Sequence, residues 1–286
     1  MTQEFLEASK KIVLVVEDKH LKETKGGFFL DTKLLKDRRV HVDYTFDVEK
    51  ELANAHSAFS LGSGFFIAPN IIATAAHVLL EATRYKHKTI ENIRFINCFC
   101  QHLIDELCNN DQKKVLIPGG NIYKPLSGQE ELVFFEYTAR SQDWAFLPVT
   151  TLDGVTAANP YFEISYDKVE RGDKISWYGH PLGLPIAYNK NNENLTVIRS
   201  DANHVFEIVD HALAGLSGAP ALKDGKVVGI VARGMGQFDL DRENQSVQLA
   251  TPKLGESEGS ECQRLETLDH RIDEVKQKFP SDSPIV

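Results

Sequence analysis

The stretch HALAGLSGAPAL, residues 211–222, places a single serine, Ser217, between glycines at positions 215 and 218. Glycine adopts backbone conformations that strain other residues, so two glycines around one hydroxyl predict a tight backbone that pushes the serine side chain outward. Such a serine is either part of an ordinary surface turn or a nucleophile. The stretch alone leaves both interpretations open, and the rest of the chain must decide between them.

The composition is that of a globular protein. The 286 residues are 42% hydrophobic and 26% charged, which fits neither a disordered chain nor a fibre. The longest apolar runs, such as IVLVV at 12–16, are too short to cross a bilayer, so we expect no membrane contact. The net charge of -9 argues against a nucleic-acid partner, which requires the neutralisation of phosphates.

The ends and the cysteines bear on location and cofactors. The N-terminal residues MTQEFLEASKKIVLVVEDKH lack the apolar segment and cleavage site of a secretory signal, so we expect a cytoplasmic protein. Three of the four cysteines lie close together with a histidine, but without the paired CxxC spacing of a zinc site. We therefore expect reduced thiols and no bound metal or cofactor; the residues concerned are Cys98, Cys100, Cys108, His102 and the distant Cys262.

Short apolar or alternating runs, separated by Gly, Pro, Asn and Asp, predict a mainly β protein. They include VHVDYTF at 40–46, GFFIAPNIIATAA at 64–76, DWAFLPV at 143–149 and KVVGIVARG at 226–234. The turn-rich segment TLDGVTAANP at 151–160 is the expected linker between two β-units. We predict a first unit over 1–150, including an N-terminal extension, and a second over 151–255.

The C-terminal segment, 256–286, is predicted to be an amphipathic helix. Apolar residues recur there at intervals of three and four and form one stripe, which Pro280 ends: Leu265, Leu268, Ile272, Val275 and Phe279. The stripe either docks on the protein's own body or forms an arm that binds a partner or a second copy. A second short helix is expected at QEFLEASKK, near the start.

Two further residues would make Ser217 a nucleophile. His77 stands at the start of a short apolar helical turn, where a lone histidine is either a core residue or a base. Asp143 heads an apolar strand, where a partly buried carboxylate needs a donor. An imidazole N–H supplies that donor and fixes the tautomer. The other ring nitrogen can then take the proton of a serine hydroxyl, which is otherwise a poor nucleophile.

The segments GSGFFIAPNIIATAAHV, DWAFLPV, YGHPLG and GLSGAPALKDGKVVGIVARG together resemble the signature segments of the chymotrypsin-like serine proteases, in the order His, Asp, Ser. Within that superfamily the chain is most similar to the bacterial HtrA-type and intracellular branches, over residues 58–236. The resemblance implies two six-stranded antiparallel β-barrels with the active site between them. It makes His77 the general base, Asp143 its orienting carboxylate and Ser217 the nucleophile.

The same resemblance implies an oxyanion hole and a substrate strand. The backbone N–H groups of Gly215 and Ser217 would form the hole, and a side chain at 215 would disfavour the required peptide orientation. The strand backbone at 232–234 could pair with an extended peptide. A protein or peptide is therefore the expected substrate, and the residues expected to contact it are His211, Ala212, Ala232, Arg233 and Gly234.

The primary specificity stays open between two interpretations. No acid stands at the expected pocket floor, which disfavours cleavage after Lys or Arg. His211 or Arg233 would favour an acidic side chain in the pocket, whereas Ala212 and Ala232 would suit a small aliphatic one.

Departures from the family pattern bear on regulation. Leu216 replaces the aspartate that pairs with the new N-terminus in zymogen-type relatives, so we expect no activation by propeptide removal. Ala219 and Ala232 replace a glycine and a serine found in many relatives, and both leave the reacting atoms in place. The stretch 81–130 lengthens the His-to-Asp spacing and is expected to be an insertion. It is either a lid, docking surface or regulatory element, or a tolerated surface excursion.

The sequence thus predicts a serine endopeptidase that forms an acyl-enzyme on Ser217. A regulatory protein is expected to gate it through the C-terminal helix or the 81–130 insertion. The alternative is a protease-fold interaction module with weak or no catalysis, but such a module has no physical need to keep all three groups. His180 and His204 are expected to be structural or to lie on the surface.

Overall fold

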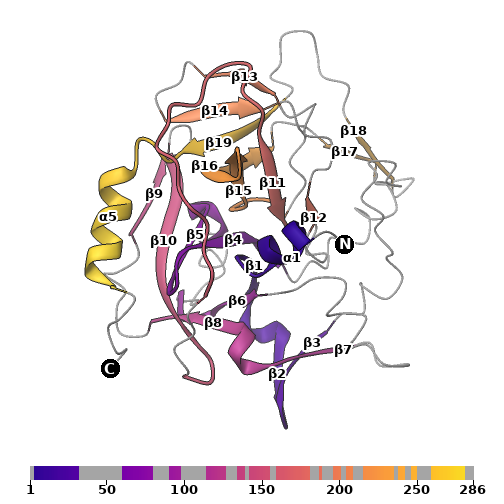
Figure 1. The fold of residues 1–286 in the computed structure, drawn as a ribbon. Helices are drawn as coiled ribbons and strands as arrows, with labels where there is room; N and C mark the ends of the chain where they lie inside the picture. Colours follow the sequence, from indigo (N-terminus) through magenta and orange to yellow (C-terminus); the bar gives the residue numbers. More distant parts are fainter. Residues whose placement is uncertain are drawn as a thin grey trace.

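The computed structural model describes residues 3–31, 60–79, 90–97, 114–126, 134–138, 142–154, 159–180, 187–188, 196–200, 204–208, 215–234, 238–241, 246–249 and 259–280. These residues form mainly antiparallel strands, arranged as two barrels, with helix α1 near the N-terminus and helix α5 near the C-terminus (Figure 1). The predicted fold class, two antiparallel β-barrels with a C-terminal helix, is confirmed. The expected short helix near the start is α1 (Gln3–Ser9).

The first barrel is a closed ring of six strands. In ring order they are β5 (Ile71–Thr74), β4 (Ser60–Ala68), β1 (Ile12–Glu17), β6 (Ile93–Asn97), β8 (Ile122–Pro125) and β10 (Gln142–Thr151). The pairing of β10 with β5 closes the ring, and β9 (Phe134–Thr138) adds a further strand beside β10. The strands β1 and β5 are buried at every position, since continuous apolar runs bury both faces of a strand.

Two of these strands correct the interpretation of 81–130 as an insertion. Both β6 and β8 lie inside this stretch, and β8 pairs with β6 on one side and with β10 on the other. Because β6 also pairs with β1, removing the two strands would open the barrel wall. The remaining parts, except β7 and the short 3-10 helices, lie outside the described residues, as do Cys98, Cys100, Cys108 and His102.

Smaller elements extend from the barrels. A three-stranded sheet, in the order β2 (Leu21–Thr24), β3 (Gly27–Asp31) and β7 (Lys114–Ile117), projects from the first barrel (Figure 1). A two-stranded hairpin consists of β17 (Phe238–Asp241) and β18 (Ser246–Leu249). Short 3-10 helices are η1 (Asp18–His20), η2 (Ile90–Asn92) and η3 (Gly119–Asn121).

The second barrel has the strand order β12-β11-β15-β16-β19-β14-β13. The strands are β11 (Ser176–Gly179), β12 (Ala187–Tyr188), β13 (Val197–Arg199), β14 (Val205–Ile208), β15 (Pro220–Lys223), β16 (Lys226–Gly234) and β19 (Ser260–Arg264). A bridge between Lys174 and Thr196 brings the segment before β11 beside β13. Backbone bonds from Gly172 to Val197, and from Val197 to Asp173, continue this contact and close the sheet.

The strand β19 corrects the prediction of one helix over 256–286. It lies in the middle of the second barrel, between β16 and β14, and α5 begins at Asp269 and ends at Lys278. The helix packs against β10 of the first barrel (Figure 1). The apolar stripe nevertheless points inward, because four of its members are at most 3% exposed: Leu265, Leu268, Ile272 and Val275. The stripe therefore docks on the protein's own body.

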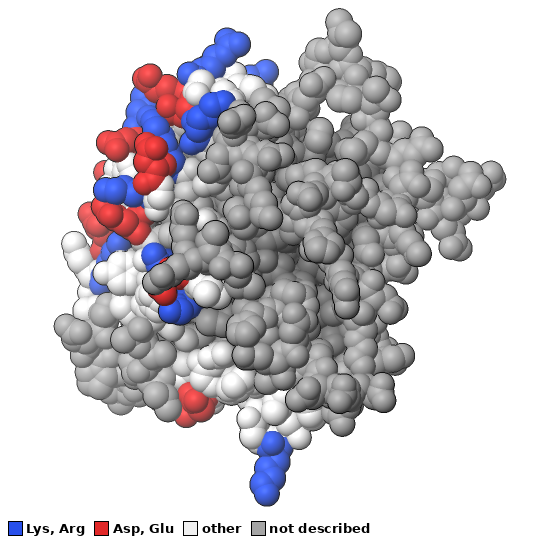
Figure 2. Space-filling view, turned by 45° about the vertical axis from the view of Figure 1, so that its right-hand side comes forward, with Lys and Arg blue, Asp and Glu red and all other residues white. Residues whose placement is uncertain are grey.

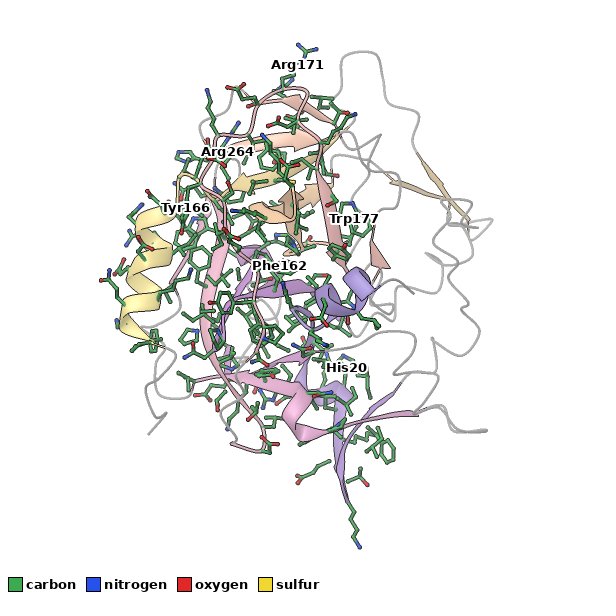
Figure 3. The ribbon with its side chains drawn as sticks, viewed as in Figure 1. His20, Phe162, Tyr166, Arg171, Trp177 and Arg264 are labelled. Carbon is green, nitrogen blue, oxygen red and sulfur yellow. The ribbon has the colours of Figure 1, made fainter. Side chains whose placement is uncertain are left out.

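The segment around Phe162 crosses between the barrels near the middle of the molecule (Figure 3). Phe162 packs edge-on against Phe65 of β4, with 6.1 Å between ring centroids, and its backbone N–H donates to the carbonyl of Phe66. Two residues later, Ile164 forms a parallel bridge with Val227 of β16. One apolar cluster consequently includes residues of both barrels and of the α5 segment.

The charge of the surface and the length of the helices concern possible nucleic-acid and membrane partners. Among the described residues visible in Figure 2, acidic and basic side chains are interspersed. None of the helices in the described part of the chain has the length and apolar character that a membrane crossing requires.

Candidate active site

His77 and Asp143 are brought together by two paired strands. His77 belongs to the helical turn 76–79 that follows β5, and Asp143 is the second residue of β10, which pairs with β5. The Nδ1 atom of His77 lies 2.7 Å from Oδ2 of Asp143, and the backbone N–H of His77 donates to Oδ1 at 2.9 Å. One carboxylate therefore fixes both the ring and the backbone of the histidine.

The carboxylate of this pair is buried and the imidazole is partly exposed, an arrangement that can fix the tautomer of the His77 ring. The Asp143 side chain is 3% exposed, whereas the His77 side chain is 20% exposed, so the ring is the solvent-accessible member. Ala75 and Ala76, which precede the histidine, are fully buried, and the N–H of Val78 closes the turn by donating to Ala75 at 3.2 Å. Small residues thus let the chain turn inside the core and present the imidazole.

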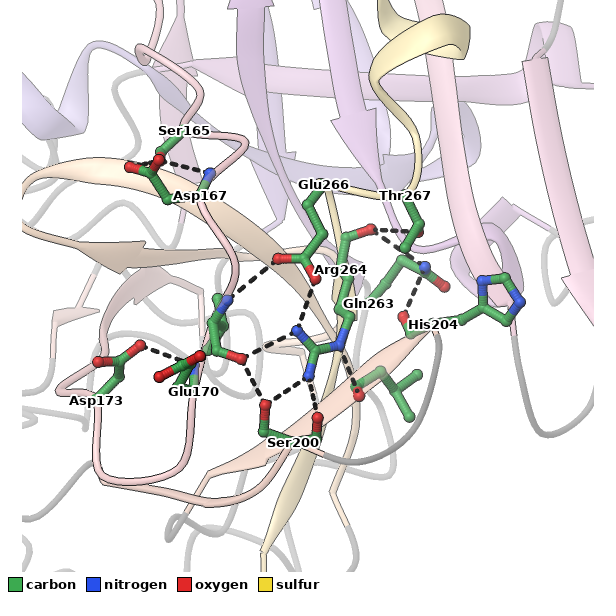
Figure 4. A network of polar contacts seen from close by, with 12 residues as sticks. Ser165, Asp167, Glu170, Asp173, Ser200, His204, Gln263, Arg264, Glu266 and Thr267 are labelled. Carbon is green, nitrogen blue, oxygen red and sulfur yellow. Dashed lines mark hydrogen bonds and ion pairs between the residues drawn. The ribbon is translucent and has the colours of Figure 1, made fainter.

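Gln263 of β19 holds the aspartate from the second barrel. Its Oε1 accepts from the backbone N–H of Asp143 at 3.1 Å. Its Nε2 donates to the carbonyls of His204 and Arg264 at 2.8 and 3.3 Å (Figure 4). Gln263 is fully buried. No local sequence pattern marks Gln263 as a site residue, because its partner is 120 residues away in the chain.

Arg264 of β19 joins several segments of the second barrel through buried hydrogen bonds. Its guanidinium donates to the carbonyls of Val205, Val169 and Ser200, to the hydroxyl of Ser200 and to the carboxylate of Glu266, at 2.8–3.2 Å (Figure 4). The residue is 2% exposed. A buried charge is tolerated when every donor has a partner, and this network therefore fixes the strand that carries the preceding glutamine.

The loop that carries Ser217 has the tight backbone that its glycines predicted. Gly215 has φ of +92° and Gly218 has φ of +89°, both in the left-handed region. A Cβ at Gly218 would lie 2.0 Å from the carbonyl oxygen of Ser63 and 2.2 Å from Oγ1 of Thr74. Glycine at 218 is thus required both by conformation and by space, while Ser217 itself stays partly exposed.

The same loop lies against the first barrel, beside the turn of His77. The carbonyl of Ser217 accepts from the N–H of Ser63 in β4 at 2.7 Å. A Cβ at Gly62 would meet both this carbonyl oxygen, at 2.7 Å, and Cγ2 of Val78, also at 2.7 Å. Gly62 therefore lies between the backbone of Ser217 and the side chain of Val78, the residue that follows His77.

Leu216 anchors the loop through apolar packing. It is 1% exposed and belongs to the apolar cluster of the second barrel, together with Trp177 and Ala219. A Cβ at Gly179 would lie 2.8 Å from its Cδ2 atom, so the contact with β11 is close. Apolar burial thus holds the loop where the family resemblance implies an ion pair in zymogen-type relatives.

The expected substrate-contacting residues are only partly described. Arg233 and Gly234 lie in the second half of β16 and pair with Glu261 and Ser260 of β19. Within the described residues, Ile230 is the last residue of β16 that pairs with β15. The positions of β16 after Ile230 therefore lie beyond the end of β15. Ala232 is only 2% exposed, which leaves little of it for a ligand to touch. His211 and Ala212 lie outside the described residues.

His180, His204 and Cys262, which were noted in the sequence, are buried or bonded through their backbone. His180 is 1% exposed, and its backbone N–H donates to the Ser63 hydroxyl at 2.9 Å. The carbonyl of His204 accepts from Gln263 and from the N–H of Arg264. Cys262 is a buried free thiol. Within the described ranges, no three His, Cys, Asp or Glu side chains are grouped to hold a metal ion.

The sequence pattern of the trypsin-like peptidase domain matches residues 62–230, more than half of the chain. The protein belongs to the trypsin-like peptidase family. The matched segment of this trypsin-like peptidase runs from β4 to β16 and contains His77, Asp143 and Ser217. The strand β19 and helix α5 follow it in the chain and complete the second barrel and its packing on the first.

Solved structures of the protease Rv3671c in its inactive form are similar to this trypsin-like peptidase. A serine-to-alanine mutant from M. tuberculosis H37Rv has 12% sequence identity and a TM-score of 0.46, covering 97% of this chain and 92% of that one. A second inactive-form structure has 13% identity and a TM-score of 0.47, covering 95% and 92%. No curated protein matches the sequence.

Proposed function

We propose that this trypsin-like peptidase is a serine endopeptidase that cleaves peptide bonds through an acyl-enzyme on Ser217. The observation that carries the proposal is the double contact between His77 and Asp143, with Nδ1 at 2.7 Å from Oδ2 and the backbone N–H at 2.9 Å from Oδ1. A carboxylate so placed selects the tautomer whose Nε2 accepts a proton and stabilises the imidazolium that forms.

In the proposed reaction, Nε2 of His77 takes the proton of the Ser217 hydroxyl as Oγ attacks the peptide carbonyl carbon. The carbonyl oxygen becomes an oxyanion, which the N–H groups of Gly215 and Ser217 stabilise. The C–N bond then breaks, and the imidazolium gives its proton to the leaving amine. Water, deprotonated by His77, attacks the remaining ester, releases the acid and restores the hydroxyl.

The proposed substrate is an extended peptide segment. The backbone of β16 continues past Ile230, the last residue that pairs with β15, and Val231 bonds to Gly218 and Ala219 of the Ser217 loop. An extended peptide would pair with the positions of β16 that follow Val231. A regulatory protein and a cytoplasmic location stay predictions. Because the apolar stripe of α5 is buried, a regulator that used this helix would meet its charged and polar face.

The test is hydrolysis of an unfolded protein by the full chain and single-residue variants. Ser217→Ala and His77→Ala should lose hydrolysis, and Asp143→Asn should lower kcat by about 10⁴-fold because the wrong tautomer is favoured. Ser165→Ala is the matched control, since its hydroxyl bonds to Asp167 within an exposed turn. This variant should keep the wild-type rate.

Two results would overturn the proposal. Equal hydrolysis by the wild type and Ser217→Ala would exclude an acyl-enzyme on this residue. A folded wild type that hydrolyses no unfolded protein or peptide would favour the alternative, a protease-fold interaction module with weak or no catalysis.

A further inference from the structure

Ser63 of β4 joins the two barrels at the Ser217 loop through its backbone N–H and its hydroxyl, while its carbonyl bonds within the first barrel. Its N–H donates to the carbonyl of Ser217 at 2.7 Å, and its own carbonyl accepts from Oγ1 of Thr74 at 2.7 Å. Its hydroxyl donates to the carbonyl of Gly215 at 2.7 Å and accepts from the N–H of His180 at 2.9 Å. The residue is fully buried, so water does not compete for these bonds.

The direction of the hydroxyl bond follows from its partners. The amide of His180 can only donate and the carbonyl of Gly215 can only accept, so the single hydroxyl proton of Ser63 is committed to Gly215. The serine thus holds the loop at two carbonyls, those of residues 215 and 217. Along the backbone, the Gly215 carbonyl lies between the two N–H groups assigned to the oxyanion hole, and the Ser217 carbonyl follows the second of them.

Backbone bonds hold the loop after Ser217, where the N–H of Gly218 donates to Val231 at 2.7 Å and the N–H of Ala219 donates to Leu216 at 2.9 Å. Gly215 has no side chain to limit rotation of the flanking peptides, and its φ of +92° is one of several conformations open to glycine. Leu216 fixes the far side of the loop by burial, at 1% exposure. On the near side, the Ser63 hydroxyl donates to the carbonyl of the peptide that follows Gly215, at 2.7 Å.

We propose that Ser63 is a positioning residue for the oxyanion hole, which rests on the function proposed above. By fixing the carbonyls of Gly215 and Ser217, it keeps the N–H groups of those two residues aimed at one point. Ser63 touches neither the substrate nor the attacking oxygen. Its effect on catalysis is exerted through the loop, so it should act on the transition state and not on substrate binding.

The experiment compares Ser63→Ala with the wild type on a peptide that the wild type cleaves, with rates expressed per active site titrated by a fluorophosphonate. We expect kcat to fall by about 10- to 100-fold, less than the loss on deleting an oxyanion-hole donor, and KM to change by less than about 2-fold. A peptide aldehyde forms a hemiacetal with an oxygen in the hole, so its Ki should rise by a similar factor. The Ki of the cleaved product peptide should not change.

The control is Ser9→Ala, which removes another buried serine hydroxyl, on α1, where it donates to the carbonyl of Leu6. This variant should keep the wild-type kcat. If Ser63→Ala unfolds, Ser63→Cys keeps the shape and supplies a weak donor, and it should give an intermediate kcat. Hydrolysis by the wild type with an unchanged kcat in the folded Ser63 variant would overturn this inference alone. A wild type without hydrolysis would overturn the proposed function and this inference together.

Discussion

The two barrels are stabilised in different ways. In the first, the strands β1 and β5 are buried at every position, and the apolar cluster continues through α5. In the second, a smaller apolar cluster is supplemented by the buried polar network of Arg264. The first barrel thus depends on packing, whereas the second also depends on hydrogen-bond geometry.

The candidate site lies between the two barrels, and a buried polar side chain of each barrel bonds to the backbone of the other. Gln263 of the second barrel holds Asp143 of the first, and Ser63 of the first holds Gly215 of the second. Neither barrel alone therefore supplies all the contacts that position the candidate site. Mutations in the polar contacts should therefore separate stability from activity.

Arg264→Met should have the largest effect on stability, because it leaves several carbonyls and Glu266 without their buried donor. We expect the free energy of unfolding to fall by about 3–5 kcal/mol, measured by urea denaturation. Arg271→Ala is the control: its side chain is 46% exposed and pairs with Glu274 on α5, so the loss should be about 0.5 kcal/mol or less. Equal losses for the two arginines would mean that the network does not stabilise the second barrel.

Gly218→Ala should come next, because the new methyl would meet the carbonyl of Ser63 at 2.0 Å in addition to backbone strain. We expect a loss of about 2–4 kcal/mol and a fall in hydrolysis, since the Ser217 loop must shift. Gly225→Ala isolates the strain: this glycine has φ of +79° and nothing within 4 Å of a Cβ. It should lose about 1–2 kcal/mol and keep its activity per folded molecule.

Gln263→Leu should cost about 1–3 kcal/mol, because the buried N–H of Asp143 loses its acceptor. Its effect on kcat should exceed its effect on KM, since the second barrel no longer holds the backbone of Asp143, whose carboxylate orients His77. Gln277→Leu, on the exposed face of α5, serves as the control in the same assays. If both glutamine variants retained the wild-type kcat, the second barrel would play no part in positioning the aspartate.

Asp173→Asn should have the smallest effect. Burial alone would raise the pKa of Asp173, but the N–H of Glu170 and the ammonium of Lys223, 2.7 Å away, together lower this pKa. A depressed carboxyl pKa stabilises the fold above the unfolded pKa of about 4, and this contribution is lost as pH falls through the folded pKa. The variant should be about 0.5–1 kcal/mol less stable at pH 7, and urea denaturation should show the difference closing under acidic conditions.

Much of the fold was predictable because long apolar runs specify buried strands. DWAFLPV lies within β10 and KVVGIVARG forms β16, as expected. The prediction failed at β6 and β8, where a long gap was interpreted as an insertion, and at β19, where Leu265 and Leu268 extended the helical stripe backward into a turn. In both places the strand is specified by partners distant in the chain.

The site residues divide in the same way. His77, Asp143 and Ser217 stand in local patterns that indicate chemistry, and the structure brings the first two into contact. Gln263 and Ser63 contact residues 120 and 152 positions away, so only the paired barrels reveal what they hold. A buried polar side chain acquires its role from topology, which no local pattern records.

The central claim is that His77, oriented by Asp143, activates Ser217. Its most direct test is incubation of the folded wild type, Ser217→Ala and His77→Ala with a fluorophosphonate, followed by mass spectrometry of the intact chains and their peptides. We predict one adduct per wild-type chain, on the peptide that contains Ser217, and none on either variant. An adduct at another residue, or equal labelling rates in the wild type and His77→Ala, would contradict the claim.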